Sequence, residues 1–330
     1  MRTTLILTQS DIERLMDMRT AIRVMTRAFQ AQAHGHVVMP PKVYLPLPHR
    51  SDFRAMPAYL SAPSCCGMKW VNVHPHNPSR GLPTVMGTLI INETATGFPL
   101  AVMDGLSVTR LRTGAAAGVA AKALARPRSH IVGLVGCGAM AFHQLLALAE
   151  LFRLREVKVW GYRPGEARRF CASAERRLTV PVVPVNTVNG CVAEADIIVT
   201  ITPSRTPLVR RAWLKPGTHI NAIGADAPGK QELDPRILRD ATVVVDDREQ
   251  AIHGGELNVP VAKRLFHPRH IHATLGEVLL GRAPGRTRPD ELTVFDSTGI
   301  AVHDVALGYE LFRLAVRARR GRPVRFFRST

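Results

Sequence analysis

The sequence predicts an α/β protein of two domains, one with a doubly wound parallel sheet and one of mixed α+β structure. The chain has 330 residues, more than a single hydrophobic core usually serves. From His130 onward apolar strands alternate with amphipathic helices, which requires crossover connections and therefore a parallel sheet. Before His130, short β-type runs are separated by Pro and Gly, which is typical of a largely antiparallel sheet.

The first third is expected to begin with one amphipathic helix. Thr8 and Ser10 are candidate N-caps, and apolar residues recur at helical spacing until Gly35. A second, longer helix is expected over 107–125, where many Ala and Gly residues allow close packing, and we expect it to connect the domains. The expected strands of this part are 43–45, 53–60, 68–73, 85–92 and 98–103.

The remaining chain predicts the parallel sheet and a C-terminal return. Its expected strands are 131–135, 157–160, 182–185, 197–201, 219–223 and 242–245, with helices at 139–152 and 165–178. After Leu292 we expect one strand, a helix over 300–319 and a strand over 324–327. We therefore predict one domain formed by 1–115 together with 300–330, and a second domain, with the parallel sheet, over 116–299.

Composition restricts the classes of partner. The net charge of +18 comes mostly from arginine spread along the whole chain, and the Arg313 to Arg328 cluster lacks interleaved aromatic residues, so we do not expect a nucleic-acid partner. No apolar stretch is long enough to span a membrane. Five cysteines without Cys-x-x-Cys spacing, and histidines without metal-ligand spacing, predict no disulfide framework and no metal site. A soluble, cytoplasmic protein is expected.

A glycine-rich turn predicts the cofactor site. Gly136-Cys137-Gly138-Ala139-Met140-Ala141 follows an apolar strand and opens a helix, the context in which G-x-G-x-x-A binds a dinucleotide. Gly136 permits the tight turn, Gly138 lets the backbone approach the diphosphate, and Ala141 allows close helix packing. This predicts a Rossmann-type fold that binds NAD or NADP, with Ala139 and Met140 in the same turn.

The end of the second strand of this fold bears on the choice of cofactor. An acidic residue there usually accepts the ribose hydroxyls of NAD. This chain has Gly161 at that point, followed by Arg163, with Arg168 and Arg169 one helical turn later. Space and positive charge favour a 2′-phosphate, so NADP is slightly favoured over NAD.

Several segments together resemble one known family, the ornithine cyclodeaminase/mu-crystallin family, and within it the archaeal-type alanine dehydrogenases. The resemblance extends over almost the whole chain. The matching segments are Met39-Pro40-Pro41-Lys42-Val43-Tyr44-Leu45, Asp52-Phe53-Arg54-Ala55-Met56-Pro57-Ala58, Lys69-Trp70-Val71-Asn72, Gly81-Leu82-Pro83-Thr84-Val85-Met86, Leu111-Arg112-Thr113-Gly114, Gly224-Ala225-Asp226-Ala227-Pro228-Gly229-Lys230 and Phe295-Asp296-Ser297-Thr298-Gly299.

The resemblance implies roles for individual residues. Arg54, Lys69 and Arg112 are expected to hold a substrate carboxylate, and arginine forks and lysine point charges suit that task. Asp226 follows an apolar strand at the sheet edge where such folds bind ligands, so we expect Asp226 to be catalytic. Lys69 is the second residue expected to be catalytic. Lys230 is expected to neutralise Asp226. Further contacts to cofactor or substrate are expected from Thr84, Thr113, Thr202, Ser297, Thr298 and Gly299, the last three at the start of a helix.

The implied activity is hydride transfer from the α-carbon of a small L-amino acid to NAD(P), with L-alanine and water giving pyruvate and ammonia. Ornithine cyclodeamination and cyclic ketimine reduction are the enzymatic alternatives. A second substrate ammonium would require another acid, whereas Met56, Ala58 and Tyr59 follow Arg54, which favours a small side chain. A non-catalytic NADP(H) or small-ligand binder is the alternative from another class. The resemblance also implies that the domain of 1–115 and 300–330 binds the substrate and forms a homodimer, and that the domain of 116–299 binds the dinucleotide.

Overall fold

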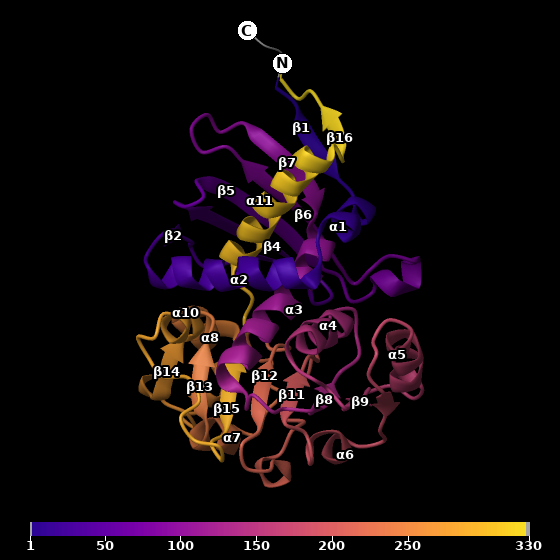
Figure 1. Cartoon of the computed structure of the whole chain (residues 1–330), viewed down its shortest axis with the longest axis vertical. Helices are drawn as coiled ribbons and strands as arrows, with labels where there is room; N and C mark the ends of the chain where they lie inside the picture. Colours follow the sequence, from indigo (N-terminus) through magenta and orange to yellow (C-terminus); the bar gives the residue numbers. More distant parts are fainter. Residues whose placement is uncertain (1, 328–330) are drawn as a thin grey trace. The chain divides into compact units, whose positions relative to one another are not determined.

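The chain divides into two compact units in a computed structural model that describes residues 2–327. One unit comprises Met1–Arg112 and Ile300–Thr330, and the other comprises Thr113–Gly299. The long helix α3 (Gly105–Leu124) begins in the first unit and continues into the second. Each unit has its own eight-stranded sheet (Figure 1).

The first unit is built on a largely antiparallel sheet, as the sequence predicts. Its strand order is β16-β1-β7-β6-β5-β4-β2, with β3 paired to β4, and among these neighbours only β1 and β7 run parallel. The strands are β1 (Thr4–Leu7), β2 (Val37–Val38), β3 (Val43–Leu47), β4 (Ser51–Leu60), β5 (Cys65–Val73), β6 (Val85–Asn92), β7 (Pro99–Asp104) and β16 (Arg322–Val324).

Helices cover one face of this sheet. Helix α11 (Ala301–Ala318) crosses β4, β5 and β6, and α2 (Met18–Ala33) packs beside it, while α1 (Gln9–Leu15) lies near α11 (Figure 1). Gly308 lets α11 approach closely, because a Cβ there would lie 2.5 Å from Leu89 Cδ2. The covered face is apolar, with Met56, Ala58 and Leu89 fully or almost fully buried. The unit also contains the 3₁₀ turn η1 (Asn77–Arg80).

The second unit contains a doubly wound parallel sheet, as predicted. The order is β10-β9-β8-β11-β12-β15-β13-β14, all neighbours are parallel, and the order reverses direction between β8 and β11. Its strands are β8 (Ile131–Val135), β9 (Glu156–Trp160), β10 (Val182–Pro184), β11 (Ile197–Thr200), β12 (His219–Ala222), β13 (Thr242–Val245), β14 (Ile271–Thr274) and β15 (Thr293–Asp296).

Short helices connect these strands and cover the sheet. Close packing of α3 against α4 depends on glycine, because a Cβ at Gly114 would lie 2.3 Å from the His143 carbonyl oxygen. The helical elements are α4 (Ala141–Leu151), α5 (Glu166–Glu175), α6 (Val188–Val192), α7 (Pro235–Asp240), α8 (Arg248–Gly254), α9 (Asn258–Ala262), α10 (Leu275–Leu279), η2 (Arg211–Trp213) and η3 (Pro268–His270).

The structure corrects four local predictions. The single N-terminal helix is wrong: Thr8 caps α1 in a capping box, and Asp17 then caps α2, its carboxylate accepting from Thr20 N at 2.7 Å. Strands β1, β2 and β14 were not predicted. The last strand is β16 at Arg322–Val324 rather than 324–327. The turn 297–299 precedes α11, which begins at Ala301.

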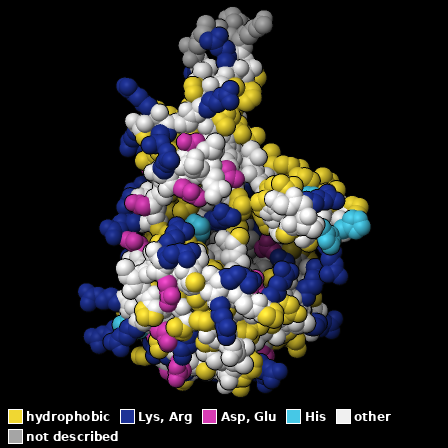
Figure 2. Space-filling model, turned by 90° about the vertical axis from the view of Figure 1, so that its right-hand side faces the viewer, with side chains coloured by type: hydrophobic (Ala, Val, Ile, Leu, Met, Phe, Trp, Pro, Cys, Tyr) yellow, Lys and Arg dark blue, Asp and Glu magenta, His cyan; other side chains and the backbone are white. Residues whose placement is uncertain are grey.

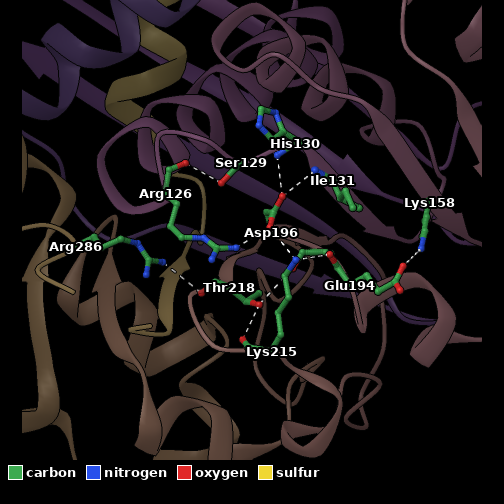
Figure 3. Close-up of polar contacts among 11 residues, drawn as sticks. Arg126, Ser129, His130, Ile131, Lys158, Glu194, Asp196, Lys215, Thr218 and Arg286 are labelled. Carbon is green, nitrogen blue, oxygen red and sulfur yellow. Dashed lines mark hydrogen bonds and ion pairs between the residues drawn. The ribbon is translucent and has the colours of Figure 1, made fainter. Parts of the chain in front are cut away.

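The amino edge of the parallel sheet is held by one buried carboxylate, Asp196 (Figure 3). It accepts from His130 N at 2.8 Å and Ile131 N at 3.0 Å, and pairs with Arg126 at 2.7 Å and Lys215 at 2.8 Å. Burial raises the pKa of Asp196, but these hydrogen bonds and charges lower it more, so the net pKa is lowered. Asp196 therefore ties the starts of β8 and β11 together.

Positive charge is spread over the face of the molecule that Figure 2 draws. Figure 2 shows Lys and Arg side chains distributed over the face drawn, with acidic side chains among them, rather than gathered in one stripe.

None of the helices formed by residues 2–327 has the length and apolarity that crossing a bilayer requires.

Candidate functional site

The carboxyl edge of the parallel sheet brings together most of the residues expected to bind the cofactor. Parallel strands end at the same edge, and ligands of doubly wound folds bind there. Segments at this edge follow β8 (136–141), β9 (161–163), β11 (Thr202), β12 (224–226) and β15 (297–299). All of them belong to the second unit.

The glycine turn has the geometry that a diphosphate requires. Gly136 has φ 104°, and a Cβ there would lie 2.8 Å from the Ile201 carbonyl oxygen, so only glycine fits. A Cβ at Gly138 would meet no atom within 4 Å, which leaves open space beside the backbone. Met140 precedes α4 without a side-chain cap, so the first amides of α4 have no side-chain partner from it. Ala141 is fully buried under the sheet.

The end of β9 carries no acid. A Cβ at Gly161 would lie 2.8 Å from Cys137 Sγ and 3.0 Å from Ala167 N, so the Cys137 side chain occupies the space next to this glycine. Arg163 lies in the following turn, where its backbone N–H donates to Glu166 Oε2 at 3.2 Å. Burial raises the pKa of the Cys137 thiol to about 11, so it is neutral at neutral pH.

Asp226 lies in the loop after β12 and is partly exposed. Lys230 Nζ forms an ion pair with Asp226 Oδ1, the neutralising contact expected from the sequence. The loop is held at both ends: Gly224 N donates to Glu232 Oε2 at 2.9 Å, and Gly229 N donates to Asn258 Oδ1 at 2.8 Å. A carboxylate held this way can accept a proton or orient a water molecule.

A chain of three buried carboxylates supports this loop. Asp296 accepts from Glu256 N at 2.9 Å, Glu256 accepts from Glu232 N at 3.0 Å, and Glu232 accepts from Gly224 N and from Thr202 N at 2.6 Å. Burial raises the pKa of Glu232, and burial together with the Glu232 charge raises the pKa of Glu256 well above its usual value. Within residues 2–327, no group of His, Cys, Asp and Glu side chains is arranged to hold a metal ion.

The turn 297–299 is fixed by Asp246, a fully buried residue that follows β13. Asp246 accepts from Thr298 Oγ1 at 3.0 Å, Gly299 N at 2.8 Å and Ser297 Oγ at 3.4 Å. The Thr202 hydroxyl likewise donates to Glu232 at 2.7 Å. These hydroxyls therefore shape the edge of the sheet, and their predicted contacts to a cofactor stay predictions.

In the first unit, Lys69 and Arg112 share one carboxylate. Lys69 of β5 and Arg112 of α3 both donate to Asp304 Oδ1 of α11, at 2.9 Å from Nζ and 3.2 Å from Nε. Lys69 is 1% exposed and also donates to Thr109 Oγ1 at 3.2 Å. Burial lowers the pKa of Lys69 to about 7, although the Asp304 charge opposes that shift. A buried lysine that titrates near neutrality is common at functional sites.

Arg54 lies on the same sheet face as Lys69. Met56 pairs directly with Lys69 across β4 and β5, and Arg54 lies two residues before Met56, so both cations point to the face covered by α11. Arg54 donates to Asp52 from Nε at 2.9 Å and from Nη2 at 3.1 Å, and its guanidinium lies 5.2 Å from the Tyr44 ring centre.

The two remaining threonines belong to different units. Thr84 lies in the exposed segment before β6 in the first unit, whereas Thr113 follows Arg112 on α3, is buried and belongs to the second unit. Their contacts to cofactor or substrate stay predictions.

Sequence reasoning missed the carboxylates that hold these groups. They are Asp52, Glu232, Asp246, Glu256, Asp296 and Asp304. Asp246 comes directly after an apolar strand, and Asp296 is the last residue of another. This position is a signal that could have identified both. Asp304 has no such signal, because it is distant in sequence from the cations that it contacts.

The glycine turn on a doubly wound sheet places this chain in the class of dinucleotide-binding α/β proteins. Residues 2–312 match the Ornithine cyclodeaminase/mu-crystallin family, and the chain belongs to that family. It is 49% identical to an alanine dehydrogenase of Archaeoglobus fulgidus over 326 residues, which are 98% of this chain and 99% of that protein.

Solved structures with the same fold match almost the whole chain. An archaeal alanine dehydrogenase dimer with bound NAD superposes with a TM-score of 0.94 at 48% identity, covering 99% of this chain and 100% of that one. The Thermococcus litoralis Delta(1)-pyrroline-2-carboxylate reductase, in complex with NADH and L-proline, gives 0.95 at 32% identity, covering 97% and 100%. A lysine cyclodeaminase gives 0.88 at 32% identity, covering 98% and 95%.

Proposed function

We propose that this protein is an NAD(P)-dependent amino acid dehydrogenase that converts L-alanine and water to pyruvate and ammonia. The observation that carries the proposal is the full-length similarity, at 49% identity, to an alanine dehydrogenase. The local geometry supports it, because the chain has both a glycine turn suited to a dinucleotide and an aspartate on the same sheet edge. The two domains expected from the sequence would then divide the work, with the cofactor in 116–299 and the substrate in the remainder.

The residues have distinct roles in this mechanism. Arg54, Lys69 and Arg112 hold the substrate carboxylate by charge-assisted hydrogen bonds. Asp226 accepts a proton from the substrate ammonium and then orients the water that attacks the imine, while Lys230 stabilises its charged form. Gly136, Gly138 and the start of α4 would hold the diphosphate of NAD(P), which when bound would supply the acceptor for the α-hydrogen as hydride.

An absorbance assay for reduced nicotinamide tests the reaction. NAD or NADP is supplied with a panel of L-amino acids, and ammonia release is measured in parallel. Reduced cofactor with L-alanine supports the proposal and identifies the nucleotide. Ammonia from L-ornithine without net cofactor reduction would instead establish a cyclodeaminase.

Cyclic ketimine reduction is the second candidate, because a pyrroline-2-carboxylate reductase superposes over almost the whole chain. The same assay run with Delta(1)-pyrroline-2-carboxylate and reduced cofactor tests it. Turnover of that substrate in the absence of activity with pyruvate and ammonia would replace the dehydrogenase proposal.

We also propose a homodimer formed through the sheet of the first unit. The face away from α11 presents Val43, Leu45, Phe53 and Trp70, and Leu45 and Trp70 are 51% and 38% exposed. Phe53 stacks on Trp70 with ring centres 5.1 Å apart. A second copy of this chain is the proposed occupant, because apolar sheet faces of this kind mark interaction sites and the archaeal relative is a dimer.

A further inference from the structure

One buried side chain of the first unit has no role in the mechanism above. Asp304 lies in the first turn of α11, is fully buried, and hydrogen-bonds both Lys69 and Arg112 through the single oxygen Oδ1. Its second oxygen, Oδ2, is buried and has no hydrogen-bond partner in the described chain. A buried carboxylate oxygen without a hydrogen-bond partner costs free energy, so stability alone does not account for this arrangement.

Asp304 occupies only part of the donor capacity of each cation. Lys69 Nζ has three hydrogens, and its bonds to Asp304 Oδ1 and Thr109 Oγ1 use two of them. Arg112 contacts Asp304 through Nε, which is the one side-chain hydrogen bond that Arg112 makes within the described residues, so its two Nη groups stay available. The Nη pair is the edge of a guanidinium that binds a carboxylate in two parallel hydrogen bonds.

The charges of the trio are unbalanced. Protonated Lys69 and Arg112 carry two positive charges and Asp304 carries one negative charge, so one positive charge remains in a buried place. A monocarboxylate would neutralise that charge, and burial makes such pairing necessary.

We propose that Asp304 is a positioning residue for the substrate: it holds Lys69 by Nζ and Arg112 by Nε so that the remaining donors of both receive one substrate carboxylate. The inference rests on the proposed function and deepens it, because it selects a monocarboxylate as the group bound. Asp304 itself does not contact the substrate in this arrangement.

The protonation state of Lys69 supports the proposal. Groups facing it are Asp304 and His303 of α11, Arg112 and Thr109 of α3, and Lys42. Burial lowers the pKa of Lys69 to about 7, and among these groups Asp304 is the one that raises it. Replacing the Asp304 charge therefore lowers the Lys69 pKa further and leaves the amine neutral at neutral pH.

The test is calorimetric titration of pyruvate into the wild type and Asp304→Asn, each saturated with oxidised cofactor so that pyruvate is not reduced. We expect Asp304→Asn to raise the pyruvate Kd at least about tenfold at pH 7, because a buried charge pair has lost one partner. The pH at which pyruvate binding weakens should also move to lower pH than in the wild type. Cofactor affinity should stay within about twofold, since cofactor and carboxylate contacts are separate.

Asp196→Asn is the matched control. Asp196 is also a buried carboxylate that holds two basic side chains, Arg126 and Lys215, but it lies at the amino edge of the other sheet. It should lower thermal stability and leave the pyruvate Kd and its pH dependence unchanged. A wild-type Kd and pH dependence in folded Asp304→Asn would overturn the proposal and leave Asp304 a merely structural residue.

A third variant covers the case in which Asp304→Asn fails to fold. Asp304→Glu keeps the charge and moves the carboxylate by about one carbon–carbon bond, so we expect the wild-type pH dependence but weaker pyruvate binding. Wild-type affinity in Asp304→Glu would overturn the positioning role. Failure of the dehydrogenase proposal is recognised separately, because a wild type that binds pyruvate without turnover retains the carboxylate site and loses only the reaction.

Discussion

Asp226 is the single side chain on which the proposed chemistry most depends. It follows β12 and is paired with Lys230. We expect Asp226→Asn to lower kcat by about 10²- to 10⁴-fold, the usual contribution of a positioned acid–base group. Cofactor affinity should be retained, and tryptophan or nicotinamide fluorescence measures it. Full turnover in Asp226→Asn would remove the catalytic assignment.

Lys69 gives the site a pH dependence. Burial lowers its pKa to about 7, so Lys69 is protonated below that pH and loses its charge as the pH rises through it. In the proposed mechanism pyruvate binding needs the charged form, so we expect it to weaken between pH 6 and pH 8 by about tenfold. Pyruvate titrations across this range check the expectation. The Lys69→Met variant should bind weakly at every pH, and a dependence that persisted there would assign it to another group.

At the scale of elements, the glycine turn between β8 and α4 limits which residue fits at the end of β9. Cys137 Sγ occupies the space beside Gly161, where an NAD-binding acid would be expected. We expect the protein to use NADP(H) at least as well as NAD(H). The double variant Gly161→Asp/Cys137→Ala should shift kcat/KM toward NAD by about tenfold or more, because the new carboxylate repels a 2′-phosphate.

Steady-state rates with both cofactors measure this shift. Cys137→Ala alone serves as the control, since it makes space without adding charge and so isolates the contribution of the carboxylate. A double variant whose NADP/NAD ratio equals that of Cys137→Ala would show that another residue selects the cofactor.

At the scale of the whole molecule, the exposed face of the first sheet predicts the assembly. Leu45 is 51% exposed on β3, on the face opposite α11. We expect Leu45→Glu to convert a dimer into a monomer, because a charge buried without a partner in an interface costs several kcal/mol, about enough to shift assembly at micromolar concentration. Light scattering after size-exclusion chromatography measures the mass. The control is Leu265→Glu, at an exposed position of the other unit (53%), which should leave the mass unchanged.

The sequence determined the features that depend on local pattern. The alternation of strands and helices after His130 predicts the parallel sheet, and strands β8, β13 and β6 were predicted at their observed bounds. The glycine turn at 136–141 could be predicted because a tight turn with φ 104° at Gly136 requires glycine whatever surrounds it. The position of Asp226 could also be predicted, because loops that follow parallel strands lie at the same edge of the sheet.

Only the tertiary structure decided which charges meet. Asp304 lies 235 residues from Lys69 and 192 from Arg112 in the sequence, yet one of its oxygens contacts both. In the same way, the Asp296 carboxylate accepts from the backbone amide of Glu256, and the Glu256 carboxylate accepts from that of Glu232. Such contacts are set by packing between distant elements, and a single sequence carries no periodic signal of them. Short strands such as β1 are decided in the same way, because β7 provides the hydrogen bonds that stabilise it.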